Sequence, residues 1–185
     1  MPDDTCAAAW RDLRLSVDDM QLRRWRDDDL DALLRHADDA QVVRGLSERF
    51  PHPYTRADGE AFLGGRVVDL SHPVLAIEIG GEACGGIALR PGHGERAHAA
   101  ELGYWLGRQH WGQGRMTRIV AAYLDWAVPA LGLLRVEATV LDGNAASARV
   151  LEKNGFAREG VRRGALRKQQ RLHDLLLFGR VYAPR

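Results

Sequence analysis

The fold of this chain is decided by one stretch of sequence, Glu101-Leu-Gly-Tyr-Trp-Leu-Gly-Arg-Gln-His-Trp-Gly-Gln-Gly-Arg-Met116. An extended apolar segment runs into a glycine-rich turn, and the turn opens directly into an amphipathic helix. The first N–H groups of a helix lack partners within it and lie at the positive end of its dipole, and glycines let an anion approach them closely. The stretch therefore predicts an anion site that suits a phosphorylated cofactor.

Regular elements are expected on both sides of this stretch. Before it, the glycine pair at 80–81 joins strands 74–79 and 82–89 in a hairpin, and a loop over 90–96 precedes a strand over 97–106. After it, the helix continues to Leu131 with Pro129 as a kink or early stop, and a buried strand covers 134–140. Asn144 caps a further helix that ends at Gly155, and two antiparallel strands, 156–166 and 171–182, close the chain.

The N-terminal part is predicted to be mainly helical. Residues 1–12 form a flexible leader, and residues 13–185 form a single domain, because no linker or internal repeat divides them. Short strands are expected over 13–17 and 22–25. Helices follow over 30–38, over 41–50, and from Thr55 as far as Leu70.

The composition excludes several classes of protein. With 26 basic and 25 acidic residues the net charge is +1, so no nucleic-acid or membrane partner is expected. No apolar run approaches the ~18 residues of a membrane span. Cys6 and Cys84 form no disulfide framework, and the scattered histidines, including His173 beside Asp174, give no metal-ligand spacing. We expect a cytoplasmic protein without a metal.

The glycine turn by itself is a weak signal. No Lys-Ser/Thr pair follows Gly114, as a P-loop requires, and the spacing is not that of a dinucleotide-binding turn. The glycines could also serve only a tight connection between strand and helix. A second motif decides between these alternatives: Asn144-Ala-Ala-Ser147-Ala-Arg-Val-Leu151-Glu-Lys153-Asn-Gly155-Phe156.

Together, in this order and with the strand Leu134–Glu137 between them, the two motifs resemble the GNAT superfamily of acetyl-CoA-dependent N-acetyltransferases. More narrowly, the chain looks like the branch named for ribosomal-protein N-terminal (alanine or serine) acetyltransferases, which also contains enzymes for small amines. The resemblance covers about residues 20–182. It implies an α/β (α+β) fold with a mixed, twisted central sheet of about seven strands, a splayed parallel pair of strands, and helices on both faces.

The resemblance also assigns the cofactor site. The pantetheine arm of acetyl-CoA is expected to pair like an extra strand with Tyr104, Trp105 and Leu106. The pyrophosphate is expected on the turn, and Asn144 is expected to contact the cofactor from the other side of the cleft or to cap its helix. The turn residues are Gln109, Gly112, Gln113, Gly114, Arg115 and Met116.

The expected chemistry is direct attack of a primary amine on the thioester. An alkylammonium with a pKa near ~10 must first lose a proton. Glu101 matches an acidic position common in the family and is the candidate base; a structural salt bridge to an arginine is the alternative. Ser147 is the candidate acid, or it only hydrogen-bonds the sulfur or positions the cofactor. Tyr104 and Tyr54 are weaker candidate proton donors.

The acceptor is either a peptide or protein N-terminus or a small-molecule amine. The first helices and the loop 50–54 are expected to select it, and four aromatic residues line an apolar pocket or belong to the core: Trp25, Phe50, Tyr54 and Trp105. Some ribosomal-protein enzymes carry a glutamate in the part that here reads Val161–Leu166, and no acid occurs there. A basic stretch occupies the region instead, as a solvated face or as an attraction for acidic groups: Arg162, Arg163, Arg167, Lys168 and Arg171.

Two other classes of function remain open at this point. One is a module that binds acetyl-CoA without turnover, and the other is a nucleotide-binding protein that uses the glycine turn. The chain is expected to be a monomer, or a homodimer formed through an apolar edge strand near the C-terminus.

Overall fold

The computed structural model describes residues 10, 12–46, 50–168 and 170–182. Its strands are β1 (Arg14–Val17), β2 (Met20–Arg24), β3 (Val74–Ile79), β4 (Glu82–Pro91), β5 (Ala99–Leu106), β6 (Arg135–Leu141), β7 (Ala157–Lys168) and β8 (Arg171–Val181). Its α-helices are α2 (Leu30–Ala37), α3 (Ala40–Arg44), α4 (Arg56–Leu63), α5 (Arg115–Ala130) and α6 (Ala145–Lys153). Short 3₁₀ turns include η1 (Asp27–Asp29), η2 (Gly94–Arg96) and η3 (Arg108–His110).

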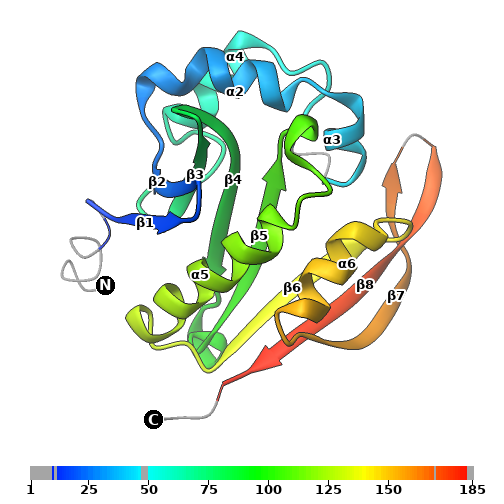
Figure 1. The fold of residues 1–185 in the computed structure, drawn as a ribbon. Coiled ribbons are helices and arrows are strands. Elements are labelled where there is room, and N and C mark those ends of the chain that lie inside the picture. Colours follow the sequence, from blue (N-terminus) through cyan, green and yellow to red (C-terminus); the bar gives the residue numbers. More distant parts are fainter. Residues whose placement is uncertain (1–9, 11, 47–49, 169, 183–185) are drawn as a thin grey trace.

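The eight strands form one sheet in the order β1-β2-β3-β4-β5-β6-β8-β7. Every neighbouring pair is antiparallel except β5 and β6, which are parallel and pair only from Ala99↔Arg135 to Glu101↔Glu137. Beyond Glu101 the two strands diverge (Figure 1). The predicted mixed sheet with a splayed parallel pair is therefore confirmed, with eight strands instead of about seven.

Helices cover both faces of the sheet, as expected. Alternate residues of a strand point to opposite faces, and Leu102 and Leu106 of β5 join the main core beneath α5. That core includes Ile119, Val120 and Tyr123, all fully buried. On the other face Trp105 packs in a second cluster with residues of α2 and α4.

A buried ion-pair cluster fixes the entry into α2. Arg23 on β2 is 2% exposed and donates from both terminal nitrogens to the Asp29 carboxylate, each at 2.7 Å, and from Nε to Glu78 on β3. Asp29 also accepts from the backbone N–H of Arg26 at 2.8 Å. A guanidinium presents its donors in a planar fork that matches a carboxylate, so this cluster satisfies its buried charges.

Several boundaries differ from those expected from the sequence. The helix predicted over 41–50 is the shorter α3, which ends at Gly45, and residues 47–49 lie outside the described residues. The helix predicted as far as Leu70 ends at Gly64, so Val67 and Leu70 lie beyond it. Glycine has the poorest helix propensity after proline, and the Gly64-Gly65 pair supplies the stop.

Most of the predicted leader, residues 1–12, lies outside the described residues. Trp10 is described, and it is 4% exposed in the main core, with the Arg24 guanidinium 5.1 Å from the centroid of its ring. This residue of the predicted flexible leader is therefore part of the core.

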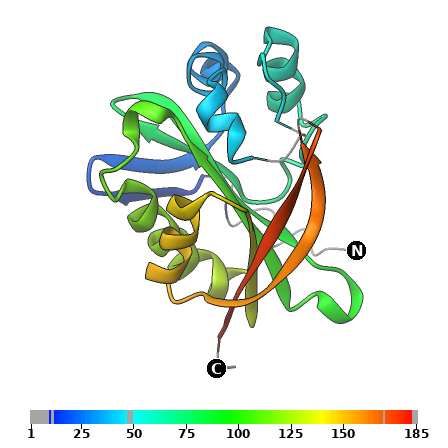
Figure 2. The ribbon, with the colours of Figure 1, turned by 90° about the vertical axis from the view of Figure 1, so that its right-hand side faces the viewer.

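The β7–β8 hairpin rises beside the diverging strands toward α3 (Figures 1 and 2). At its end Lys168 donates from Nζ to the backbone oxygens of Val43 and Leu46, both at 2.7 Å. These carbonyls lie at the C-terminal end of α3, where backbone oxygens lack helical partners and favour a cation. The contact links the far end of the sheet to the helices over its opposite half.

Candidate functional site

The glycine turn lies where the sequence places it, between β5 and α5. Gly114 is the N-cap of α5 and has φ 68°, and Gly112 has φ 76°. Both angles lie in the left-handed region, which costs an L-residue with a side chain about 1–2 kcal/mol. Trp111 donates from Nε1 to the Leu106 carbonyl at 2.7 Å and so fastens the turn to the end of β5.

The anion site predicted from the sequence would lie at the N-terminus of α5. No acidic residue stands in its first turn, and Arg115 and Met116 open the helix. The Arg115 guanidinium contacts His110 Nδ1 at 2.9 Å and Asp19 at 2.7 Å. The predicted turn residues lie in η3, in the glycine turn and at the start of α5, where the positive end of the helix dipole favours an anion: Gln109, Gly112, Gln113, Gly114, Arg115 and Met116.

One edge of β5 is open next to this turn. Tyr104, Trp105 and Leu106 pair with Ile87, Gly86 and Gly85 of β4, while pairing with β6 stops at Glu101. Their opposite backbone edge therefore faces the gap between the diverging strands. An extended chain with amide groups can pair with such an edge in the manner of an added strand.

Ser147 faces this gap from α6. Asn144 caps that helix, since its Oδ1 accepts from the Ser147 N–H at 3.1 Å. The Tyr104 hydroxyl lies 2.9 Å from Ser147 Oγ and donates to the Ser147 carbonyl at 3.2 Å. Burial raises the pKa of Tyr104 to about 12, so its proton is held at neutral pH. The serine is joined to β5, the strand predicted to pair with the cofactor, by a hydrogen bond that the sequence did not indicate.

Asn154 fastens α6 to its neighbour. This residue is 6% exposed and donates from Nδ2 to the carbonyls of Thr117 on α5, at 3.2 Å, and of Val150, at 2.8 Å. The C-terminal end of α6 is consequently tied to the first turn of α5, and the two helices lie on the same side of the sheet (Figure 1).

Glu101 lies at the point where β5 and β6 separate. By strand alternation it shares a face with Trp105, opposite to Tyr104 and Ser147. Its Oε2 pairs with Arg90 on β4, and its Oε1 accepts from Thr139 Oγ1 on β6 at 3.3 Å. The salt bridge to an arginine, which is the structural alternative to a catalytic role of Glu101, is thus present. The Glu101 side chain nevertheless remains about one-third exposed (35%).

Aromatic residues gather on the same face as Glu101. Phe50 lies 5.1 Å from Tyr54 and 5.3 Å from Trp105, measured between ring centroids, and Trp25 lies 5.1 Å from Phe62. The four predicted aromatic residues therefore belong to one cluster, together with Phe62, which the sequence did not single out. The buried Nε1 of Trp25 has no hydrogen-bond partner among the described residues.

The basic stretch and the His173-Asp174 dipeptide, both singled out in the sequence, do not form a compact site. The basic residues 162, 163, 167 and 171 lie on the exposed β7–β8 hairpin, as a solvated face would. His173 and Asp174 do not act as a pair with each other: His173 Nδ1 contacts Asp142 at 2.7 Å, and Asp174 accepts from the Gly164 N–H. No helix within the described ranges is long and apolar enough to cross a bilayer.

Comparisons with known proteins agree with this geometry. Residues 19–157 match the model of the acetyltransferase (GNAT) domain family, so the chain belongs to the GNAT acetyltransferase family. The uncharacterized N-acetyltransferase p20 of Bacillus licheniformis is 38% identical over 79 residues, which are 43% of this chain and 44% of that relative.

Solved structures extend the likeness to nearly the whole chain. Mycobacterium smegmatis RimJ in complex with CoA-disulfide is similar with a TM-score of 0.76 and 26% identity, over 93% of this chain and 88% of that chain. A ribosomal-protein-alanine N-acetyltransferase from Brucella melitensis is similar with a TM-score of 0.72 and 25% identity, over 87% and 99% of the two chains. The resemblance to the ribosomal-protein branch is thereby confirmed.

Proposed function

We propose that this protein transfers the acetyl group of acetyl-CoA to a primary amine. The observation that carries the proposal is the open edge of β5, which lies between the glycine turn and the N-terminus of α6. An anion site, a free strand edge and a hydroxyl are thus aligned along one gap. They suit the pyrophosphate, the amide-bearing arm and the sulfur of acetyl-CoA, in that order.

The acceptor amine approaches from the face that carries Glu101. A Cβ built at Gly103, between Glu101 and Trp105, meets no heavy atom within 4 Å, so this face is open beside the gap. The aromatic cluster borders it and can bury apolar atoms of the acceptor. Both a peptide N-terminus and a small amine satisfy these requirements.

The proposed reaction forms one C–N bond and breaks one C–S bond. The Glu101 carboxylate first takes one proton from the ammonium, directly or through water, and the neutral amine nitrogen then attacks the thioester carbonyl carbon. As the tetrahedral intermediate collapses, the C–S bond breaks and the second proton of the nitrogen passes to the sulfur through Ser147 or water, so that coenzyme A leaves as a thiol. Ser147 hydrogen-bonds the sulfur as the negative charge develops there. In this step the Tyr104 hydroxyl donates to Ser147 Oγ, 2.9 Å away, which leaves the serine proton for the sulfur.

The test combines calorimetry with a thiol-release assay. Acetyl-CoA is titrated into the purified chain, and release of free thiol is then followed with peptides beginning in Ala or Ser, polyamines and aromatic amines. We expect micromolar cofactor binding and thiol release that depends on one acceptor class. Tight cofactor binding without acceptor-dependent thiol would instead identify a binding module, and ATP binding at least as tight as that of coenzyme A would identify a nucleotide site.

A further inference from the structure

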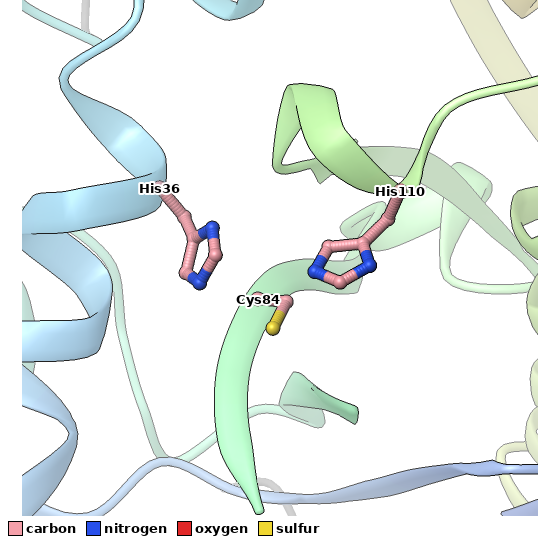
Figure 3. Close-up of side chains that lie close together, drawn as sticks. All are labelled: His36, Cys84 and His110. Atoms are coloured by element: carbon pink, nitrogen blue, oxygen red, sulfur yellow. The ribbon is translucent and has the colours of Figure 1, made fainter. Parts of the chain in front are cut away.

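Three metal-ligating side chains that are distant in the sequence meet beside the glycine turn. His36 comes from α2, Cys84 from β4 and His110 from η3, and one ligand atom from each lies within 4.8 Å of the other two. Figure 3 shows the two imidazole rings on either side of the Cys84 thiol. None of these residues takes part in the proposed acetyl transfer.

The cluster is buried and closely packed. His36 is 3% exposed and Cys84 is 1% exposed. The N–H of Gly107 donates to the Cys84 carbonyl at 2.7 Å, and a Cβ at Gly107 would lie 2.6 Å from His36 Nδ1, so only glycine fits between these two ligands. The rings of His36 and His110 are 5.7 Å apart between centroids. Tight backbone packing, rather than chance proximity of flexible side chains, sets this arrangement.

The surroundings of the cluster can complete a coordination sphere. The Glu82 carboxylate lies 3.5 Å from His36 Nε2 and is held by Arg35 at 2.7 Å. A surface pocket of about 370 Å³, lined by Arg35, His36, Asp39, Arg108 and Gln109, leads to His36 and provides a path from solvent.

We propose that His36, Cys84 and His110 bind a borderline-soft divalent cation of the zinc type. Imidazole nitrogen and thiolate sulfur are both ligand types that zinc takes in tetrahedral sites, and Glu82 or water would fill the fourth position. Zn–N and Zn–S bonds of about 2.0–2.3 Å require the ligand atoms to move closer together than 4.8 Å. Rotation of the partly exposed His110 side chain supplies part of this movement.

Binding has a defined consequence for the neighbouring charges. The Cys84 thiol loses its proton to solvent as the metal–sulfur bond forms. His110 then carries its proton on the nitrogen that does not bind the metal. If Nε2 binds, Nδ1 becomes a donor, and Arg115 must leave its 2.9 Å contact with that atom. The guanidinium keeps Asp19, 2.7 Å away, as a partner.

The ion would join α2, β4 and the turn that precedes α5, because each element contributes one ligand. A ligand that binds only the folded state raises stability by mass action. Stability therefore offers a readout of binding that does not depend on acetyltransferase activity.

The experiment uses the full chain after treatment with a chelator and a reductant. Zn²⁺ is titrated by calorimetry, Co²⁺ is added as a spectroscopic probe, and Tm is recorded with and without Zn²⁺. We expect one ion per chain with a Kd at or below micromolar, a cobalt–thiolate charge-transfer band, and a rise in Tm. His36→Gln, Cys84→Ser and His110→Gln should each weaken binding at least about 100-fold, beyond the loss expected from an outer partner of a metal site.

Matched variants separate this site from adventitious binding. Cys6→Ser removes the other thiol, and His72→Gln removes an exposed histidine outside the cluster; both should bind Zn²⁺ as the parent does. Circular dichroism checks that each variant is folded. If His36→Gln or Cys84→Ser does not fold, because these side chains are buried, His110→Gln is the decisive variant, because His110 is partly exposed. Binding only at millimolar Zn²⁺, a cobalt spectrum without the thiolate band, or full affinity in folded His110→Gln would overturn the proposal.

Discussion

At the scale of single residues, strand alternation separates the candidate groups. Glu101 and Tyr104 stand three positions apart on β5 and therefore point to opposite faces of the sheet. The carboxylate lies on the face of the aromatic cluster, and the phenol lies on the face of α6. In the proposed reaction, Glu101 therefore acts on the acceptor amine from one face of the sheet, and Tyr104 and Ser147 act near the thioester sulfur from the other face.

Glu101→Gln tests the role of the carboxylate. If Glu101 is the base, kcat should fall roughly 100-fold with little change in cofactor affinity, and the acidic limb of the pH–rate profile should change. Arg90→Met is the matched control, because it removes the ion-pair partner but leaves the carboxylate. Equal losses of kcat in the two variants would show that the ion pair, and not base catalysis, matters.

Tyr104→Phe tests the hydrogen bond to Ser147. It keeps the ring packing and removes the hydroxyl 2.9 Å from Ser147 Oγ, so we expect kcat to fall by roughly 10-fold or less while the KM for acetyl-CoA changes little. Because the tyrosine acts through the serine, the same substitution should have almost no further effect in a Ser147→Ala background. Additive losses in this double-mutant cycle would contradict a positioning role.

At the scale of elements, the site depends on how two helices begin. Gly114 caps α5 in the left-handed region, and Asn144 caps α6 through its side chain. Both beginnings could be predicted from the sequence, since capping is decided by residues close along the chain. The packing of the two helices could not be predicted in this way: Asn154, at the C-terminal end of α6, donates to the Thr117 carbonyl in the first turn of α5.

Gly114→Ala should weaken cofactor binding and stability together. The substitution strains a residue at φ 68° by about 1–2 kcal/mol and disturbs the amides that are proposed to hold the pyrophosphate. Gly132→Ala is the matched control, since Gly132 follows the other end of α5 with φ 61° and open space around it. We expect a similar loss of stability in both variants, measured by urea unfolding. Only Gly114→Ala should raise the Kd for coenzyme A; equal Kd values would contradict the assigned role of the turn.

At the scale of the whole molecule, polar contacts join the two halves that diverge at the gap. Lys168 ties the β7–β8 hairpin to α3, and Arg96 of η2 pairs with Glu137 on β6. Within the C-terminal half, Arg135 on β6 pairs with both Glu137 and Glu159, the latter on β7. Hydrogen bonds from Arg135 are the main reason that the pKa values of Glu137 and Glu159 lie below the usual range.

This cluster predicts part of the acid sensitivity of the fold. A carboxyl group whose pKa is lowered by folding contributes stability above its unfolded pKa, and this contribution is lost as the pH falls through the folded value. The free energy of unfolding should therefore decline below about pH 4.5, the ordinary value for Glu, and less steeply in Glu159→Gln. Urea titrations at several pH values measure this slope. Glu152→Gln is the matched control, because it removes an equal charge from the exposed face of α6. An unchanged slope in Glu159→Gln would contradict the assignment of this acid sensitivity to the Arg135–Glu159 pair.

The sequence alone determined the features that arise from neighbours along the chain. The glycine turn, the start of α5, the Asn144 cap and the alternation of β5 were all predictable, because backbone preferences and periodicity act over a few residues. They sufficed for the family and the fold class, and the residues of the cofactor site stay a prediction. They overestimated α3 and α4, whose ends depend on local stops and on packing.

Only the tertiary structure decided which distant side chains meet. The burial of Trp10, the pairing of Glu101 with Arg90, the bond from Tyr104 to Ser147 and the grouping of His36, Cys84 and His110 all depend on strand register and helix packing. The three metal-ligating residues stand in α2, β4 and η3 without any motif spacing, so no local pattern signals them. Contacts between elements follow from the topology of the sheet, which one-dimensional periodicity does not specify.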